Sequence, residues 1–193
     1  MVRRGGVDMQ RSLSDGRTVT LRPLKRRDVA AARTFFNRLL SEHESNEELG
    51  ILRHRSVTMA EERRFVEGEV RDMKKGKVVG LAALDGDAIV GHCRIDRGES
   101  PDVSHSGVLG IAILDGHRGV GLGEALMRAV LDGARDQGIT LVELQVFAIN
   151  SRAIALYRKI GFKVSGTVPG KIRRYGRRID ELSMYMDLAE GSP

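Results

Sequence analysis

The pattern of apolar and polar positions along the chain predicts strands and amphipathic helices that share one core. Short runs in which apolar residues alternate with polar ones, or follow one another directly, are typical of strands. Such runs cover residues 17–22, 78–84, 88–95, 108–114, 140–147, 162–166 and 180–187. Segments with apolar residues every three or four positions are typical of helices. They cover residues 29–39, 59–73, 122–137 and 151–160.

Turn and cap residues separate these segments. Asp28 occupies the N-cap position of the first helix, and Thr58 with Glu61 has the form of a capping box for the second. Asp85-Gly86 between two strand-like runs predicts a β-hairpin. The predicted order is therefore one strand, two helices, three strands, a helix, a strand, a helix and two strands.

Length and composition favour one globular domain and exclude several classes of protein. The 193 residues can bury one core, and we expect a loose tail at 1–15 followed by a domain at 16–188. The single cysteine, Cys93, rules out an internal disulfide and a zinc site of several cysteines, so we expect no metal. Without a membrane-length apolar run or a signal-like start, we expect a cytoplasmic protein.

The net charge of +6, from 32 Lys and Arg against 26 Asp and Glu, narrows the class of partner. A basic surface suits either nucleic acid or a ligand with several phosphate groups. Aromatic residues make up only 4% of the chain and do not interleave with the basic clusters to stack bases. We therefore expect no nucleic-acid partner and consider a phosphate-bearing ligand.

The sequence Arg-Gly-Val-Gly-Leu-Gly at residues 118–123 carries the most specific chemistry. It follows the apolar run 108–114 and opens an amphipathic segment, so a strand, a glycine-rich turn and a helix succeed one another. Alternating glycines let successive backbone N–H groups point outward at the positive end of the helix dipole, which suits a pyrophosphate. Arg118 adds a guanidinium at the mouth of the turn.

The glycine spacing excludes the dinucleotide fingerprint G-x-G-x-x-G and the ATP-binding P-loop. A second block, at residues 150–162, reads Asn-Ser-Arg-Ala-Ile-Ala-Leu-Tyr-Arg-Lys-Ile-Gly-Phe. Together, the Arg-x-x-Gly-x-Gly turn and this N-x-x-A-x-x-L-Y-x-K-x-G-F block resemble motifs A and B of the GNAT superfamily of acyl-CoA-dependent N-acetyltransferases. The resemblance covers about residues 17–188.

The resemblance implies a fold, a cosubstrate and a set of binding residues. The fold is α/β: a GNAT-type single domain with a mixed six- or seven-stranded sheet, splayed between its central strands, and helices on both faces. The cosubstrate is acetyl-CoA, its pyrophosphate on the turn and its pantetheine arm paired with a strand edge. The implied cofactor-binding residues are Ile111, Ile113, Arg118, Gly119, Val120, Gly121, Leu122, Gly123, Asn150 and Tyr157.

Tyr157 and Asn150 each have two interpretations. In the family, the tyrosine that matches Tyr157 lies beside the sulfur of CoA and acts as general acid. A phenol can protonate a departing thiolate in a dry site. Tyr157 also shares the core face of its predicted helix, so a tyrosine that only packs is the alternative. Asn150 would cap that helix, hydrogen-bond the cofactor arm, or do both.

The general base is less constrained by the sequence. Many relatives carry a glutamate on the strand of motif A, where residues 108–111 offer none. Glu143 is our first candidate, with His92 and His105 beside it; a solvated glutamate, a hydrogen-bonded histidine or a water chain are the alternatives. Cys93 is not expected to carry an acyl group, because no His-Asp pair accompanies it.

The implied reaction moves an acetyl group from acetyl-CoA directly to a primary amine of a small molecule, an amino acid or a protein. The segment 175–186 resembles the closing hairpin of the branch that acetylates amino acids or protein amino groups. The acidic loop predicted at 41–49 would attract a cationic amine, or is simply solvated. The alternative function is a non-catalytic module that binds acyl-CoA or nucleic acid on the same fold. A homodimer is left open.

Overall fold

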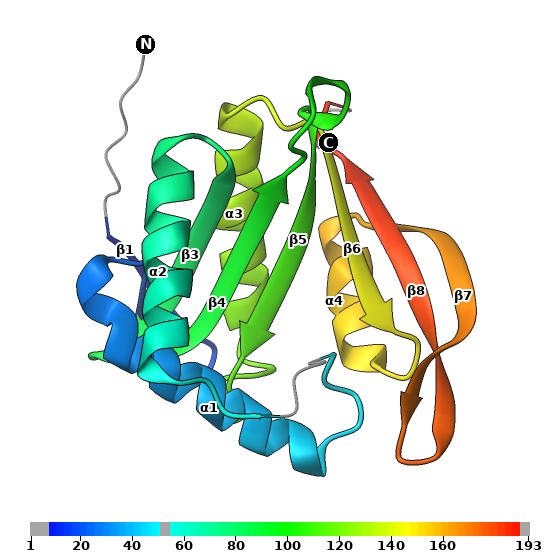
Figure 1. Cartoon of the computed structure of the whole chain (residues 1–193), viewed down its shortest axis with the longest axis horizontal. Coiled ribbons are helices and arrows are strands. Elements are labelled where there is room, and N and C mark those ends of the chain that lie inside the picture. Colours follow the sequence, from blue (N-terminus) through cyan, green and yellow to red (C-terminus); the bar gives the residue numbers. More distant parts are fainter. Residues whose placement is uncertain (1–7, 51–54, 190–193) are drawn as a thin grey trace.

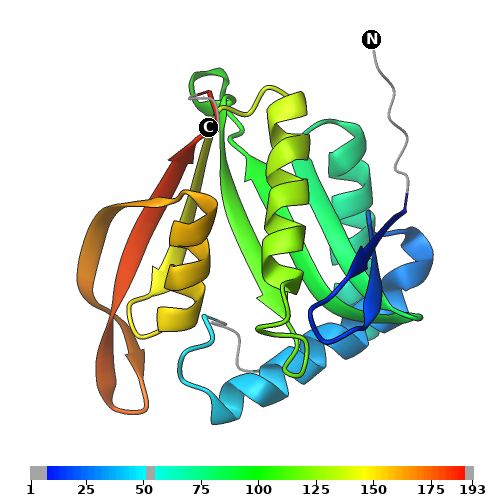
Figure 2. The same ribbon diagram turned by 180° about the vertical axis from the view of Figure 1, so that it is seen from behind.

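The computed structural model describes residues 8–50 and 55–189 as a mixed eight-stranded sheet with helices on both faces (Figure 1). The strands are β1 Met9–Ser12, β2 Thr18–Arg22, β3 Val78–Asp85, β4 Ala88–Arg97, β5 Ser106–Ile113, β6 Leu141–Phe147, β7 Lys163–Arg174 and β8 Arg177–Asp187, in the spatial order β1-β2-β3-β4-β5-β6-β8-β7. The helices are α1 Val29–Ser45, α2 Met59–Lys74, α3 Leu122–Asp136 and α4 Ser151–Ile160. Helices α1 and α2 lie on one face, and α3 and α4 on the other (Figures 1 and 2). The predicted α/β class is confirmed.

The central strands β5 and β6 form the parallel pair of the sheet and soon separate. They pair over three positions, from Ser106 opposite Leu141 to Val108 opposite Glu143. Beyond Val108 the two strands diverge toward the carboxyl end of β5 (Figure 1). This confirms the predicted splay between the central strands.

The sheet has one strand more than the predicted six or seven, because residues 9–12 form β1. They pair antiparallel with β2. The buried side chain of Leu13 and a hydrogen bond from Ser14 N–H to Val120 O (3.1 Å) hold this hairpin against the glycine-rich turn. The expected loose tail is therefore wrong for residues 9–12, whose strand conformation depends on pairing rather than on apolar alternation.

The predicted starts of the first two helices are correct, but they form differently. Thr58 Oγ1 accepts from Glu61 N–H (3.2 Å), and Glu61 Oε2 accepts from Thr58 N–H (2.9 Å), which is the predicted capping box. Asp28 does occupy the N-cap of α1, but its carboxylate does not cap the helix. It binds Arg22 Nη1 (2.6 Å) and Nη2 (3.0 Å) and accepts from Lys25 N–H (2.7 Å).

Two elements extend further than the sequence indicated. Helix α1 continues to Ser45, so much of the predicted acidic loop at 41–49 is helical. Strands β7 and β8 meet at Tyr175-Gly176, whose φ angles of 48° and 75° are those of a two-residue hairpin turn. The hairpin is rich in basic residues, so its apolar alternation is weak and the pattern predicted strands only at 162–166 and 180–187.

The helices bury different kinds of side chain. Leu122 and Leu126 of α3 are fully buried in the main core. On α2, the apolar side chain of Phe65 is 42% exposed. Glu62 and Glu69 are buried instead, so the inner face of α2 carries two carboxylates. Such burial requires polar partners on the sheet.

Candidate active site

The three glycines of the turn after β5 have two separate structural purposes. Gly119 and Gly121 have φ angles of 77° and 88°, a region that side chains with a β-carbon rarely adopt. The φ of Gly123 is not positive, but a β-carbon there would lie 2.9 Å from Leu156 Cδ2. The first two glycines therefore shape the turn, and the third permits close packing of α3 against α4.

The backbone of this turn presents a row of open donors. Within the part of the chain that the structure describes, no hydrogen bond engages the N–H groups of residues 119–123. The first N–H of the segment to be satisfied is that of Ala125, which donates to Gly121 O (3.1 Å). Unpaired N–H groups at a helix N-terminus favour an anion. The turn therefore fits a phosphate-bearing ligand.

Two arginines, Arg118 and Arg152, flank the turn, and only Arg118 was predicted as a site residue from the sequence. Arg118 is largely enclosed: Nε donates to Ile113 O (2.8 Å), and Nη2 pairs with the carboxylate of Glu42 on α1. Arg152, which the sequence reasoning missed, is exposed and lies over Gly119, where a β-carbon would overlap its guanidinium. The sequence feature that could have indicated Arg152 is its position as a cation in the first turn of α4.

The edge of β5 that faces the splay is open beyond Val108. Leu114 N–H donates to Val90 O of β4. Because the polar groups of a strand point to alternate sides, those of Ile111 and Ile113 point away from β4. Ile113 O accepts from Arg118, whereas Ile111 has no such partner among the described residues. The site thus joins an open strand edge to the donor-rich turn.

Tyr157 on α4 lies in the main core, 7% exposed, with its ring 6.1 Å from that of Phe162. Burial raises the pKa of its phenol, so the hydroxyl keeps its proton at neutral pH. The hydroxyl makes no hydrogen bond to the described residues, yet it is not fully enclosed. Burial also raises the pKa of the Cys93 thiol, which disfavours a nucleophilic thiolate.

Both polar atoms of the Asn150 side chain are engaged. Oδ1 accepts from Ala153 N–H (3.0 Å), which confirms the predicted cap of α4. Nδ2 donates to Glu48 O (3.0 Å) in the loop after α1. Arg174 holds the same loop through Glu47 O (3.0 Å) and Leu49 O (2.8 Å). Asn150 therefore connects α4 to the loop after α1.

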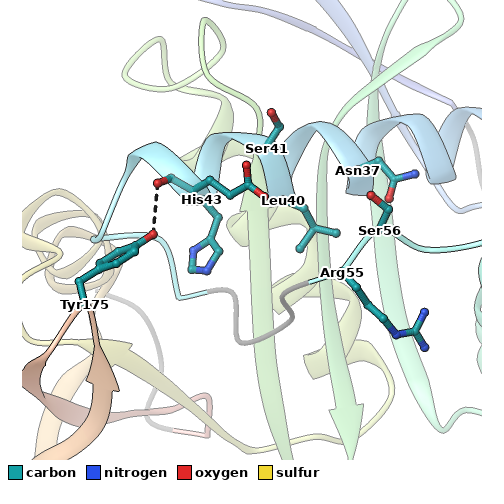
Figure 3. Close-up of a pocket in the computed structure, with 8 residues that line it drawn as sticks. Asn37, Leu40, Ser41, His43, Arg55, Ser56 and Tyr175 are labelled. Carbon is teal, nitrogen blue, oxygen red and sulfur yellow. Dashed lines mark hydrogen bonds between the residues drawn. The ribbon is translucent and has the colours of Figure 1, made fainter.

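A hollow of about 230 Å³ lies between the end of α1, the residues before α2 and the tip of the β7–β8 hairpin. Figure 3 shows Tyr175 reaching from the hairpin to α1, where its hydroxyl donates to Glu44 O (3.1 Å). The other lining residues are Asn37, Leu40, Ser41, His43, Arg55 and Ser56.

The structure separates the three candidates for the general base. His105 is exposed at the start of β5, where its carbonyl accepts from Thr140 N–H (2.8 Å), at the opposite end of the strand from the glycine turn. Glu143 is exposed on β6, opposite Val108. His92 is largely buried on β4 and contacts Glu69. His105 is too remote, which leaves Glu143 and His92.

Along the described ranges, 8–50 and 55–189, neither a cluster of metal ligands nor a helix of membrane-spanning character occurs. No group of three or more His, Cys, Asp or Glu side chains in them could hold a metal ion. No helix in them is both long and apolar enough to cross a membrane.

Comparison with known proteins agrees with this geometry. Residues 37–162 match the model of the acetyltransferase (GNAT) family. The L-methionine sulfoximine/L-methionine sulfone acetyltransferase of Pseudomonas aeruginosa is 35% identical over 71 residues, 37% of this chain and 41% of that protein. Human N-acetyltransferase 8B is 48% identical over 50 residues, 26% of this chain and 22% of that protein. The matches thus span less than half the length of these curated relatives.

Solved structures share the fold over nearly the whole chain. A GNAT-family acetyltransferase from Streptococcus pneumoniae has a TM-score of 0.77 at 25% identity and covers 88% of this chain and 99% of its own. The ribosomal-protein-S5-alanine acetyltransferase of Vibrio fischeri has a TM-score of 0.79 at 14% identity, covering 98% and 100%. YncA of Salmonella typhimurium, solved with acetyl-CoA, has a TM-score of 0.76 at 20% identity and covers 91% of this chain and 96% of its own. Because the family model matches well over half of the sequence, the chain belongs to the GNAT family of acetyltransferases.

Proposed function

We propose that this protein is an N-acetyltransferase that moves the acetyl group of acetyl-CoA to a primary amine. The observation that carries the proposal is the row of unpaired N–H groups at residues 119–123, which lies next to the open edge of β5. A pyrophosphate suits the first feature, and an amide-rich arm suits the second. Two structural neighbours, YncA and a phosphinothricin acetyltransferase of Sinorhizobium meliloti, were solved with acetyl-CoA.

The binding residues divide between the turn and the strand. In the proposed complex, the N–H groups from Gly119 to Gly123, including those of Val120 and Leu122, hold the pyrophosphate. Arg152 adds charge from α4, in a position where it can close over the phosphates. The backbone of Ile111 and Ile113 pairs with the arm of the cofactor. Arg118 supports the turn through Glu42, and Asn150 supports the loop that faces it.

The proposed chemistry is direct transfer. Acetyl-CoA supplies a thioester whose carbonyl carbon accepts the amine nitrogen. Backbone N–H groups at the open edge of β5 stabilise the negative charge that develops on the carbonyl oxygen. Tyr157, whose buried phenol stays protonated, gives its proton to the departing sulfur. Glu143 remains a candidate for the base and is tested by Glu143→Gln.

For the acceptor we propose an amino acid or a protein amino group. The named relatives support this class: one acts on L-methionine sulfoximine and L-methionine sulfone, and others are ribosomal-protein-alanine acetyltransferases. The hollow beside α1 carries Glu44, with Glu47 and Glu48 close by in the chain. These carboxylates favour the approach of a protonated amine.

The rival function is an acyl-CoA-binding module without turnover. Release of CoA from acetyl-CoA separates the two when it is measured with L-methionine sulfone, L-methionine sulfoximine and a peptide with N-terminal alanine. We expect release above the acceptor-free rate with at least one of them. Tight acetyl-CoA binding by calorimetry together with no release in any assay would establish the binding module instead.

A further inference from the structure

A buried carboxylate on α2 has no role in the reaction described so far. The side chain of Glu69 has no exposed surface. Gly80 on β3 provides its space, because a β-carbon there would lie 2.9 Å from Glu69 Oε1. Removing a carboxylate from water is costly unless charged or hydrogen-bonding groups replace the water. The role of Glu69 therefore depends on the groups that its carboxylate contacts.

Both oxygens of Glu69 are occupied from β4. Oε1 lies 2.8 Å from His92 Nε2, and Oε2 accepts from Arg94 Nη1 (3.0 Å). Burial alone would raise the pKa of Glu69, but the hydrogen bond and charge of His92, with those of Arg94, hold it below its usual value. When His92 is neutral, the ionised carboxylate favours the tautomer with the ring proton on Nε2, which leaves the lone pair on Nδ1.

The Nδ1 atom of His92 is accessible. The side chain is 14% exposed, and Nδ1 is neither enclosed nor hydrogen-bonded within the described ranges. The ring lines a cavity of about 130 Å³ between α1, α2 and the sheet, with Phe35, Phe36 and Phe65 among its walls. Glu62 and Glu69 of α2 and Arg94 of β4 are the charged groups around the ring, because α1 and β5 contribute only apolar residues to this cavity.

The same ring lies on the strand next to β5, one strand width from its open edge. His92 is opposite Ala112 of β5, and Arg94 is opposite Gly110. Residues 110 and 112 share one face of the strand. A β-carbon at Gly110 would meet nothing within 4 Å, so open space lies over this position between His92 and the splay.

We propose that His92, oriented by Glu69, is the base that takes the proton from the acceptor amine; this rests on the N-acetyltransferase function proposed above. The ammonium group gives one proton to Nδ1, directly or through water over Gly110. The nitrogen then forms its bond to the acetyl carbon as the C–S bond breaks. Tyr157 protonates the sulfur and regains a proton from the nitrogen. His92 releases its proton to solvent, so each turnover yields one proton.

His92→Ala and Glu69→Gln test this assignment, with acetyl-CoA and whichever acceptor of the panel above the parent turns over fastest. We expect His92→Ala to lower kcat/KM about a hundredfold near neutral pH. Added imidazole should restore part of the loss, because it can occupy the vacated space. Glu69→Gln should lower kcat/KM without rescue, since the ring is present but loses its orientation. Acetyl-CoA affinity by calorimetry should change little in both.

Controls distinguish this role from simple support of α2. His92→Gln can still donate to Glu69 but cannot take the proton, so its turnover should be as slow as that of His92→Ala. It tests the role even if the alanine variant folds poorly. The exposed His105→Ala should match the parent. Turnover of folded His92→Gln within about twofold of the parent, against the loss expected for a missing base, would overturn the inference. A slow His92→Ala variant that imidazole does not rescue would also overturn the inference. A hundredfold loss of kcat/KM in Glu143→Gln, with none in the His92 variants, would overturn it too. No turnover of the parent with any acceptor would instead overturn the proposed function, and this inference with it.

Discussion

Glu42 on α1 and Arg118 in the glycine-rich turn form an ion pair across 76 positions of sequence, with side chains 20% and 15% exposed. Glu42 also accepts from Asp115 N–H at 2.9 Å and 3.1 Å. One carboxylate thus holds the turn to a helix on the opposite face of the sheet from α3. Arg118, which the sequence predicts as a ligand for phosphate, is in the structure engaged with Glu42 and Ile113 O.

The first prediction concerns this pair. Arg118→Met should lower the free energy of unfolding by about 1–3 kcal/mol, because Glu42 loses a partner in a largely enclosed position. A double-mutant cycle with Glu42→Gln, measured by chemical denaturation, should give a coupling of at least about 0.5 kcal/mol. The exposed pair Arg128 and Glu124, one helical turn apart on α3, is the control and should couple more weakly. Equal coupling energies in both pairs would show that Arg118 and Glu42 do not specifically stabilise the turn.

The second prediction concerns the turn itself. Gly121→Glu places bulk and negative charge beside the open N–H groups, so acetyl-CoA should bind at least about tenfold more weakly, roughly 1.4 kcal/mol. Gly138→Glu is the matched control, because Gly138 also has a positive φ, 76°, and open space around its α-carbon, but lies beyond the end of α3. Calorimetry that finds parent affinity in a folded Gly121→Glu would contradict the binding site.

Tyr157→Phe keeps the ring and its packing but removes the proton donor. As general acid, Tyr157 should account for about a hundredfold in kcat, with little change in acetyl-CoA affinity. A tyrosine that only packs predicts near-parent turnover, with a loss of about 1 kcal/mol if its hydroxyl is hydrogen-bonded in solution. Turnover and thermal unfolding of the same variant decide between the two. Activity within about twofold of the parent would exclude the acid role.

Asn150 should contribute through two separable contacts. Asn150→Ala removes the cap of α4 and the contact with Glu48, and should cost about 0.5–2 kcal/mol of unfolding free energy. Asn150→Ser keeps a capping oxygen but cannot reach Glu48, so it should recover much of that stability. Amide exchange in residues 46–49 should stay faster than in the parent for both variants. Parent-like exchange in that loop would show that the contact does not hold it.

The buried pair of Asp28 and Arg22 predicts a pH dependence of stability. Burial by itself raises the pKa of Asp28, but the hydrogen bonds from Arg22 and Lys25 N–H outweigh it, so the pKa lies below its usual value. The unfolded state therefore binds the proton first, and the free energy of unfolding falls as the pH drops below about 4. Asp28→Asn should be less stable near neutral pH and lose less on acidification. Parallel pH profiles would contradict this.

Features that depend on neighbouring residues could be predicted from the amino-acid pattern. Among the described residues, the periods of apolar positions predicted all four α-helices and seven of the eight strands. The Thr58 box and the Asn150 cap are satisfied within one helical turn. The glycines at 119 and 121 could be assigned to a turn between a strand and a helix because backbone conformation is a local property.

Tertiary structure alone decided which distant groups meet. Arg118 and Glu42, Asn150 and Glu48, and the carboxylate of Glu69 with His92 are brought together by loop paths and helix docking. Strand β1 likewise exists because β2 offers an edge. A side chain's chemistry is fixed by its type, but its partner depends on long-range packing, which leaves no periodic trace in the sequence.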